Sequence, residues 1–230
     1  MIIDNIQFAA FCKNLKIDDK VIRRQIEDSL GDFSFSFFNF SPKFDIASTM
    51  MGQTEHGHSR LQISDKTVQL FITFDEVFRN DSERCFEYAY KKIEDVAQMI
   101  NNIEGNFHSG VVIQYLFDEN KYSDDAINLI NRNSVNISGN QQFFNFSKSF
   151  SVIYKDKFYL NFKLSCINLK DDNKKIAGVS VDVNNRYASE IKNQFVGYDD
   201  IAIMKNIHQY ITNSVLDKLL MKGELDLDES

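Results

Sequence analysis

The sequence predicts an α+β fold: a tandem pseudo-repeat of β-α-β(3-4)-α, with antiparallel sheets and one long helix per half. Three observations predict it. Phe37–Ser41 (Phe-Phe-Asn-Phe-Ser) recurs as Phe143–Ser147, 106 positions later. From Phe33 to Phe37, aromatic residues alternate with serine, which is the period of a half-buried strand. Two segments, Phe86–Ile103 and Asp199–Leu219, carry apolar residues at helical spacing.

The first half, residues 1–105, begins with an expected strand at Ile6–Phe11. Asp18 and Asp19 supply a helix cap, so a short helix is expected to run to about Leu30. After the Phe-rich strand, Arg60–Ile63 and Thr67–Phe74 are joined by three short polar residues. This joint predicts a hairpin.

The long helix of the first half is expected over Phe86–Ile103, with Asn80 or Ser82 as its cap and Gly105 past its end. Residues Gly52–His58 are polar and contain two glycines, so they are expected to form a loop between strands.

The second half, residues 106–222, repeats these landmarks at an offset of 106 or 107, which is the signature of an internal duplication. Asp124 and Asp125 correspond to Asp18 and Asp19. The final helix is expected to bury apolar residues at Ile203, Ile207, Ile211, Val215 and Leu219. Residues 223–230 form an acidic tail that is expected to fray.

Composition excludes some functions. The formal net charge is −7 and no basic cluster is long enough to follow a phosphate backbone, so nucleic acid is an unlikely partner by charge. No stretch approaches the apolar length of a membrane span, and no membrane partner is expected. Three widely spaced cysteines without a paired motif predict reduced thiols in a cytoplasmic protein. No cofactor-binding motif is present, so no cofactor is expected.

Glu55, His56 and His58 form the densest group of side chains able to bind a metal, in the loop at Gly52–His58. A fourth ligand would have to come from another element. The alternative is a polar connection between strands. A second candidate, His208 with Asp75 or Asp182, could perform acid and base chemistry if a cleft joined them, and a packed helix histidine is the alternative.

The aromatic strands pose a different question. Phe35, Phe37, Phe143 and Phe144 belong to the core by default, but they could line an apolar groove between the two halves. Such a site needs no catalytic residue.

The segments Thr67–Asp75 and Val179–Val183, each leading to a long helix, resemble those of an uncharacterised, sporadically distributed prokaryotic family with tandem β-α-β(3-4)-α repeats. A third feature of the resemblance is His208 in the last helix. The resemblance implies the fold and no activity. The plan is also similar to the TATA-binding-protein-like arrangement, as an analogy of fold alone. The acidity of the chain argues against DNA binding.

These patterns favour a non-catalytic module that binds a protein partner, a second copy of itself or an apolar ligand through the surface or groove between its halves. The alternative is a metal-dependent enzyme that uses Glu55, His56 and His58.

Overall fold

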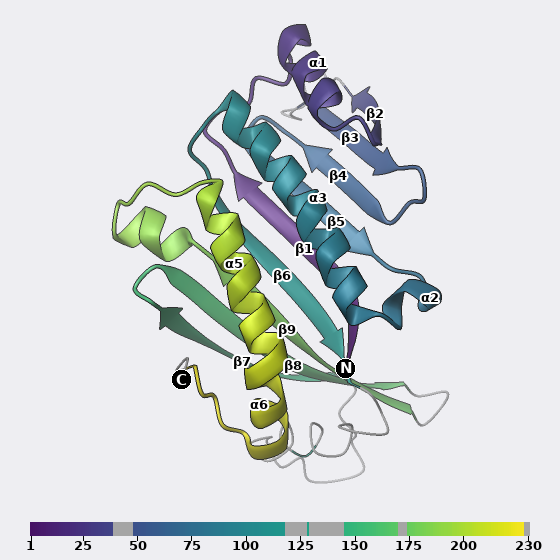
Figure 1. The fold of residues 1–230 in the computed structure, drawn as a ribbon, viewed down its shortest axis with the longest axis vertical. Helices are drawn as coiled ribbons and strands as arrows, with labels where there is room; N and C mark the ends of the chain where they lie inside the picture. The colour runs from purple at the N-terminus through teal and green to yellow at the C-terminus, as the bar shows by residue number, and fades with distance from the viewer. Residues whose placement is uncertain (39–47, 118–127, 129–144, 170–173, 228–230) are drawn as a thin grey trace.

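The computed structural model describes residues 1–38, 48–117, 128, 145–169 and 174–227. Its nine described strands form a single antiparallel sheet with the order β2-β3-β4-β5-β1-β6-β9-β8-β7 (Figure 1). The strands are β1 (Ile2–Phe11), β2 (Phe33–Phe38), β3 (Thr49–Thr54), β4 (Ser59–Ile63), β5 (Thr67–Thr73), β6 (His108–Leu116), β7 (Asn145–Tyr154), β8 (Phe158–Leu169) and β9 (Lys174–Asn184).

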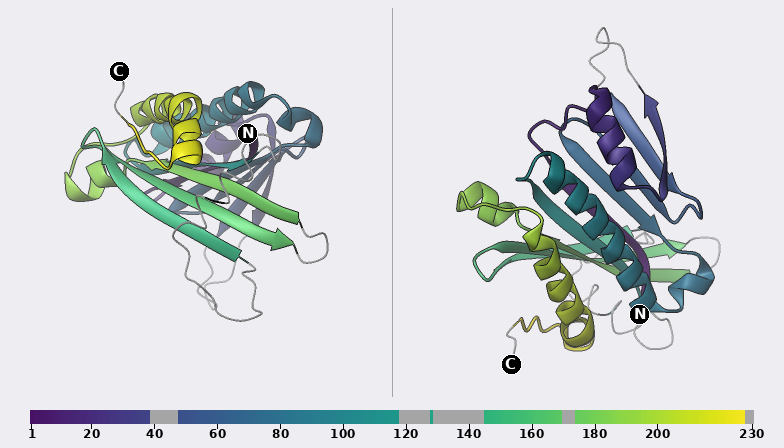
Figure 2. Two further views of the ribbon diagram at one scale, coloured as in Figure 1. Left: turned by 90° about the horizontal axis from the view of Figure 1, so that it is seen from below. Right: turned by 45° about the horizontal axis from the view of Figure 1, so that its top comes forward.

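The principal helices lie on one side of this sheet, where α3 and α5 run next to each other (Figure 1; Figure 2, left). None of the helices in the described ranges is both long and apolar enough to cross a lipid bilayer. The helices are α1 (Lys20–Ser29), α2 (Glu76–Arg79), α3 (Ser82–Ile103), α5 (Asp199–Tyr210) and α6 (Leu216–Lys222), with π-helical turns η2 (Tyr187–Ile191) and η3 (Ile211–Val215).

The centre of the sheet is the antiparallel pair of β1 and β6, in which Ala9 lies opposite Gly110. Outward from β1 follow β5, β4 and β3, and outward from β6 follow β9, β8 and β7. Helices α2 and α3 follow β5, and η2 and α5 follow β9; β5 and β9 are the two strands that flank the central pair. The two halves of the chain therefore contribute to one continuous sheet, rather than to two sheets stacked face to face.

The core lies between this sheet and the helices. One cross-strand row of the covered face runs through all nine strands and consists almost entirely of apolar residues: Phe35, Gly52, Leu61, Leu70, Phe8, Val111, Val183, Leu160 and Val152. Helix α3 buries the predicted stripe against it, including Ala89, Tyr90 and Ile93. The predicted stripe of the last helix is buried except at Ile203, which is 39% exposed and turns away from the sheet.

The helix starts differ from the prediction at one place. Asp19 caps α1, as expected, because its carboxylate accepts from the Val21 amide at 2.8 Å. Helix α3, however, is capped by Asp81, which accepts from the Arg84 amide at 3.0 Å. A carboxylate beside the first free amides outcompetes the neighbouring Asn80 and Ser82 because it also complements the helix dipole.

The predicted loop at Gly52–His58 is shorter than expected, because Gly52, Gln53 and Thr54 continue strand β3. Close packing against the neighbouring strand requires a glycine at position 52. A Cβ at this position would lie 2.6 Å from a ring carbon of Phe35 on the adjacent strand. The absence of a side chain makes room for an aromatic ring, so the glycine marks close packing inside a strand and not a turn.

The start of the tail is held against the protein. Leu225 and Leu227 are partly buried against the core, and the Lys218 ammonium lies 3.0 Å from a carboxylate oxygen of Asp226. Two leucines and one ion pair therefore connect residues 224–227 to the rest of the protein.

Candidate functional site

The face of the sheet opposite the helices, here called the open face, presents two rows of side chains that each cross all nine strands. The register places these rows on either side of the buried apolar row. The first row is Ser34, Gln53, Arg60, Phe71, Gln7, Val112, Asp182, Asn161 and Ser151. The second row is Ser36, Met51, Gln62, Gln69, Ala9, Gly110, Asn184, Tyr159 and Ile153.

The open face has few charges. Charged residues make up 26% of the chain, yet Arg60 and Asp182 are the two charged residues among the eighteen positions of these rows. Amides and hydroxyls occupy most of the others. Exposed apolar side chains stand among them: Met51 is 49% exposed, Phe71 is 38% exposed and Ile153 is 52% exposed. Depletion of charge together with exposed aromatic and methionine side chains is the composition of protein-binding surfaces.

A pocket of about 310 Å³ lies at the centre of this face. Its floor is the cross-strand pair of Ala9 and Gly110, the two smallest residues in the second row. Neighbouring residues with longer side chains surround this pair on the same face, so the missing side chains leave a hollow. The pocket is also lined by Phe11, Phe71, Gln7, Gln69, His108 and Asp182. Since β5 and β1 come from the first half and β6 and β9 from the second, both halves build it.

Asp182 supplies a carboxylate to this pocket. Its Oδ2 atom accepts hydrogen bonds from Nδ2 of Asn161 at 2.8 Å and from Nδ2 of Asn184 at 3.0 Å. The described residues offer no donor to Oδ1, which faces Gly110: a Cβ added there would lie 3.3 Å from it. Burial raises the pKa of Asp182 above its ordinary value, and the two amide donors oppose that rise. The arrangement leaves Oδ1 of Asp182 as an oriented acceptor beside the floor of the pocket.

An aromatic wall stands next to the floor. The rings of Phe11 and His108 are stacked, with centroids 4.8 Å apart and planes inclined by 19°. Burial lowers the pKa of His108, which favours the neutral imidazole. Arg186 also lines the pocket, and its guanidinium is paired with Glu190 at 2.8 Å. The pocket therefore combines aromatic surface with the carboxylate of Asp182 and a guanidinium that is already paired.

The three predicted metal ligands lie in the turn between β3 and β4. His56 and His58 have ring centroids 6.5 Å apart and line an open groove of about 900 Å³, while Glu55 is exposed. Among the residues that the structure describes, no group of three or more His, Cys, Asp or Glu side chains is arranged to hold a metal ion. His58 instead packs against Phe78, with ring centroids 5.6 Å apart.

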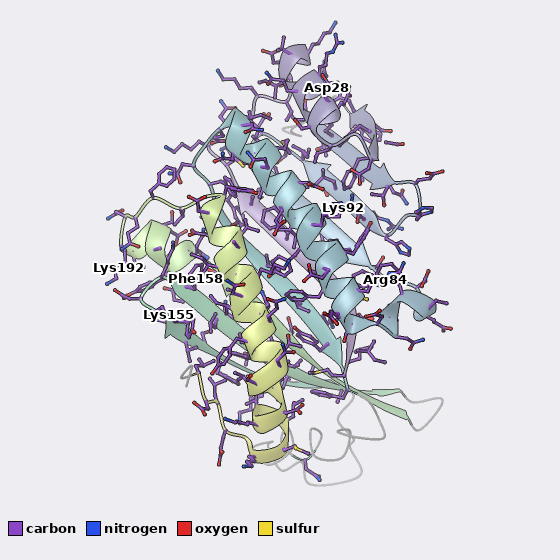
Figure 3. All side chains as sticks on the ribbon, in the orientation of Figure 1. Asp28, Arg84, Lys92, Lys155, Phe158 and Lys192 are labelled. Atoms are coloured by element: carbon purple, nitrogen blue, oxygen red, sulfur yellow. The ribbon has the colours of Figure 1, made fainter. Side chains whose placement is uncertain are left out.

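The surroundings of His58 are an aromatic cluster on the helix side. Tyr88 packs on Phe78 with ring centroids 5.7 Å apart, and its hydroxyl lies 3.0 Å from Oγ of Ser59. Arg84, near the start of α3 (Figure 3), also contacts this cluster: its guanidinium carbon lies 4.6 Å from the Phe78 ring centroid. These contacts anchor the turn and α2 to α3, which is a structural role.

Of the four residues predicted to line an apolar groove, the structure describes two. Phe35 and Phe37 lie on β2 and face the helices, where the Arg23 guanidinium stacks 3.9 Å from the Phe37 ring. Phe143 and Phe144 lie outside the described residues. The strand that begins at Asn145, β7, is at the other edge of the nine-strand sheet. The pocket on the open face is lined by residues of the central strands and by neither Phe35 nor Phe37.

The predicted acid and base pair is also separated. His208 is fully buried between α5 and the covered face, whereas Asp182 projects from the open face of β9. The sheet lies between them, so they cannot share a proton.

The pocket residues could not be identified from the sequence, because their proximity depends on the order of β5, β1, β6 and β9. A weak signal was present. Small residues at Ala9 and Gly110 interrupt strands whose other residues on that face are longer, such as Gln7 and Gln114. That signal becomes meaningful once the two strands are known to be neighbours.

The chain matches no known family model and no curated protein sequence.

Proposed function

We propose that the protein is a non-catalytic module that binds a protein partner through the open face of its sheet. The observation that carries this proposal is the pair of nine-strand rows, which are almost free of charge and expose Met51, Phe71 and Ile153. Amides that can both donate and accept, set around apolar anchors, match the mixed polar and apolar surface of another protein. A formal net charge of −7 disfavours nucleic acid as the occupant.

An internal duplication is part of the proposal. The mirrored order of strands on either side of β1 and β6 supports it, as does the long helix that follows β5 and β9. Two copies joined edge to edge provide a wide face, and their helices bury its reverse side. We place this module in the cytoplasm, in keeping with the thiol of Cys85, whose Sγ donates to the carbonyl of Phe78 at 3.2 Å.

The test is a matched pair of variants used as bait in affinity capture from the native host. Met51→Lys places a charge on the open face, and Met221→Lys places the same charge on α6 on the helix side. The two methionines are 49% and 52% exposed, so neither change disturbs the core. Captured proteins are identified by mass spectrometry, and each is then prepared and titrated against both variants.

We expect a specific partner whose affinity falls at least tenfold with Met51→Lys and stays within twofold with Met221→Lys. A charge buried against an uncharged surface is unfavourable, which is the reason for the difference. Equal binding of the two variants by every purified partner would overturn the proposal. Sedimentation of the protein alone identifies a second copy as the occupant if the dimer is lost only in Met51→Lys.

A metal-dependent enzyme is the second candidate, favoured by the lining of one groove by both His56 and His58. Elemental analysis of the purified protein tests it. Stoichiometric metal that is lost in both His56→Ala and His58→Ala would support this candidate. Metal content unchanged by these substitutions would remove it.

A further inference from the structure

The pocket on the open face has a shape that follows from the register of four strands. Along β1, Gln7, Ala9 and Phe11 point to the same side, and along β6, His108, Gly110 and Val112 do so. Equivalent side chains on a strand are about 6.7 Å apart, so the rows on either side of the Ala9–Gly110 pair are separated by about 13 Å. The space between these two rows, above Ala9 and Gly110, is here called the slot. After the thickness of the flanking side chains is subtracted, the slot has room for one inserted ring.

The walls of the slot favour an aromatic occupant. Phe11 and His108 form a stacked pair at one end, and Phe71 stands at a corner on the other side. Phe11 is 46% exposed and Phe71 is 38% exposed, so both present apolar ring surface to an incoming group. Contact between aromatic rings stabilises the complex beyond what apolar burial supplies.

The polar groups favour an occupant that donates a hydrogen bond. Oδ2 of Asp182 is already bonded to two amides, and Oδ1 faces the glycine floor. Arg186 also lines the pocket, but its guanidinium is paired with Glu190 and does not bond to Asp182. Within the described part of the chain no group donates to Oδ1, so a donor on the occupant would complete the hydrogen bonds of this carboxylate.

We propose that this pocket receives an aromatic side chain that ends in a hydrogen-bond donor, a tyrosine or a tryptophan, presented by the protein partner. The ring lies in the slot above Ala9 and Gly110, beside Phe11 and Phe71, and its O–H or N–H donates to Oδ1 of Asp182. Buried tyrosine and tryptophan residues are the most frequent anchors of protein interfaces. The inference rests on the proposed function, because it assumes that the occupant of the open face is a protein.

The test uses N-acetyl-L-tyrosinamide and N-acetyl-L-tryptophanamide as probes and N-acetyl-L-phenylalaninamide as the comparator that lacks a donor. Binding to the isotope-labelled protein is followed by NMR at the amide of Gly110 and the methyl group of Ala9. We expect saturable shifts at both positions, with at least one donor probe binding at least fivefold more tightly than the phenylalanine derivative.

Two variants on the same face assign the site. Ala9→Leu fills the slot from its floor and should reduce probe affinity at least tenfold. Gln62→Leu introduces the same leucine side chain in the same row, two strands away on β4, and should leave affinity within twofold. Folding of both variants is confirmed by their amide spectra, which should differ from wild type only near the substitution. If Ala9→Leu does not keep the fold, Asp182→Leu replaces it, and this variant should abolish the preference for the donor probes.

The outcomes separate this inference from the proposed function. No saturable shift at Gly110, or equal binding of all three probes, overturns the aromatic anchor. The open face can still bind a partner in that case, and the difference in partner affinity between Met51→Lys and Met221→Lys tests that proposed function. Probe binding that Ala9→Leu does not weaken would place the probes elsewhere and would also overturn the inference.

Discussion

The hydroxyl of Tyr90 lies 2.7 Å from Nδ1 of His208, and both residues are completely buried. Tyr90 belongs to α3 and His208 to α5, so this contact joins two neighbouring helices. Nε2 of His208 lies 3.3 Å from the carbonyl of Val181 on β9, and Nδ1 lies 3.1 Å from the carbonyl of Met204. Either ring nitrogen can donate to a backbone carbonyl, and the tyrosine hydroxyl donates to Nδ1 in one tautomer and accepts from it in the other. One histidine thus connects two helices to the sheet.

Replacement of Tyr90 by phenylalanine should destabilise the protein by about 1–3 kcal/mol, because it removes a hydrogen-bond partner from a buried ring nitrogen of His208. His208→Leu should have a similar effect through the unpaired tyrosine hydroxyl. Urea denaturation of both single variants and of the double variant measures the coupling. We expect the double variant to be more stable than the sum of the single effects implies. Strict additivity would show that the two side chains do not interact.

The stability of the protein should fall as the pH is lowered from about 6.5 to about 4. Burial lowers the pKa of His208 from 6.5 to about 4, so in this range the unfolded chain takes up a proton that the folded protein does not. Stability therefore rises with pH across the window, and the contribution of His208 is about 3 kcal/mol.

Denaturation curves for wild type and His208→Leu at half-unit pH steps measure the pH-dependent contribution of His208 to the free energy of unfolding. The difference in unfolding free energy between the two proteins should be largest near pH 7 and should shrink toward pH 4. A difference that stays constant between these limits would contradict a depressed histidine pKa.

Lys157→Met should destabilise the protein by about 3–5 kcal/mol, because it leaves the charge of Asp200 buried without its cation. The Asp200 side chain is 3% exposed, pairs with the Lys157 ammonium and accepts from Nδ2 of Asn185 at 2.7 Å. Arg24→Ala, which breaks an ion pair between side chains that are 83% and 74% exposed, is the control and should change stability by less than about 0.5 kcal/mol. Thermal unfolding of both variants is the measurement. Equal losses of stability in the two variants would show that the buried ion pair stabilises the protein no more than the exposed one.

Gly178→Ala should destabilise the protein by about 1–3 kcal/mol. A Cβ at this position would lie 2.7 Å from the backbone oxygen of Tyr115, and a backbone atom between two paired strands cannot move aside cheaply. Gly31→Ala is the matched control, because a Cβ there meets nothing within 4 Å. Its unfolding free energy should stay within about 0.5 kcal/mol of wild type. A Gly178→Ala protein as stable as the control would mean that β6 and β9 separate more easily than their pairing implies.

The sequence alone determined the local structure. Helix α3, the cap at Asp19, the hairpin of β4 and β5 and the last helix all follow from short-range patterns, because hydrophobic periodicity and capping depend on residues only a few positions apart. The same reasoning failed where packing decided, as at Gly52, whose missing side chain makes room for a ring on the next strand.

Only the tertiary structure decided which distant residues meet. The pairing of β1 with β6 sets Ala9 beside Gly110 and makes a pocket, and it sends the aromatic strand β2 and the strand β7 to opposite edges. It also sets Asp182 and His208 on different sides of the sheet, although the sequence allowed them to act together. Strand order is fixed by the burial of a complete face against the helices, and this is a property of the whole chain that no local pattern contains.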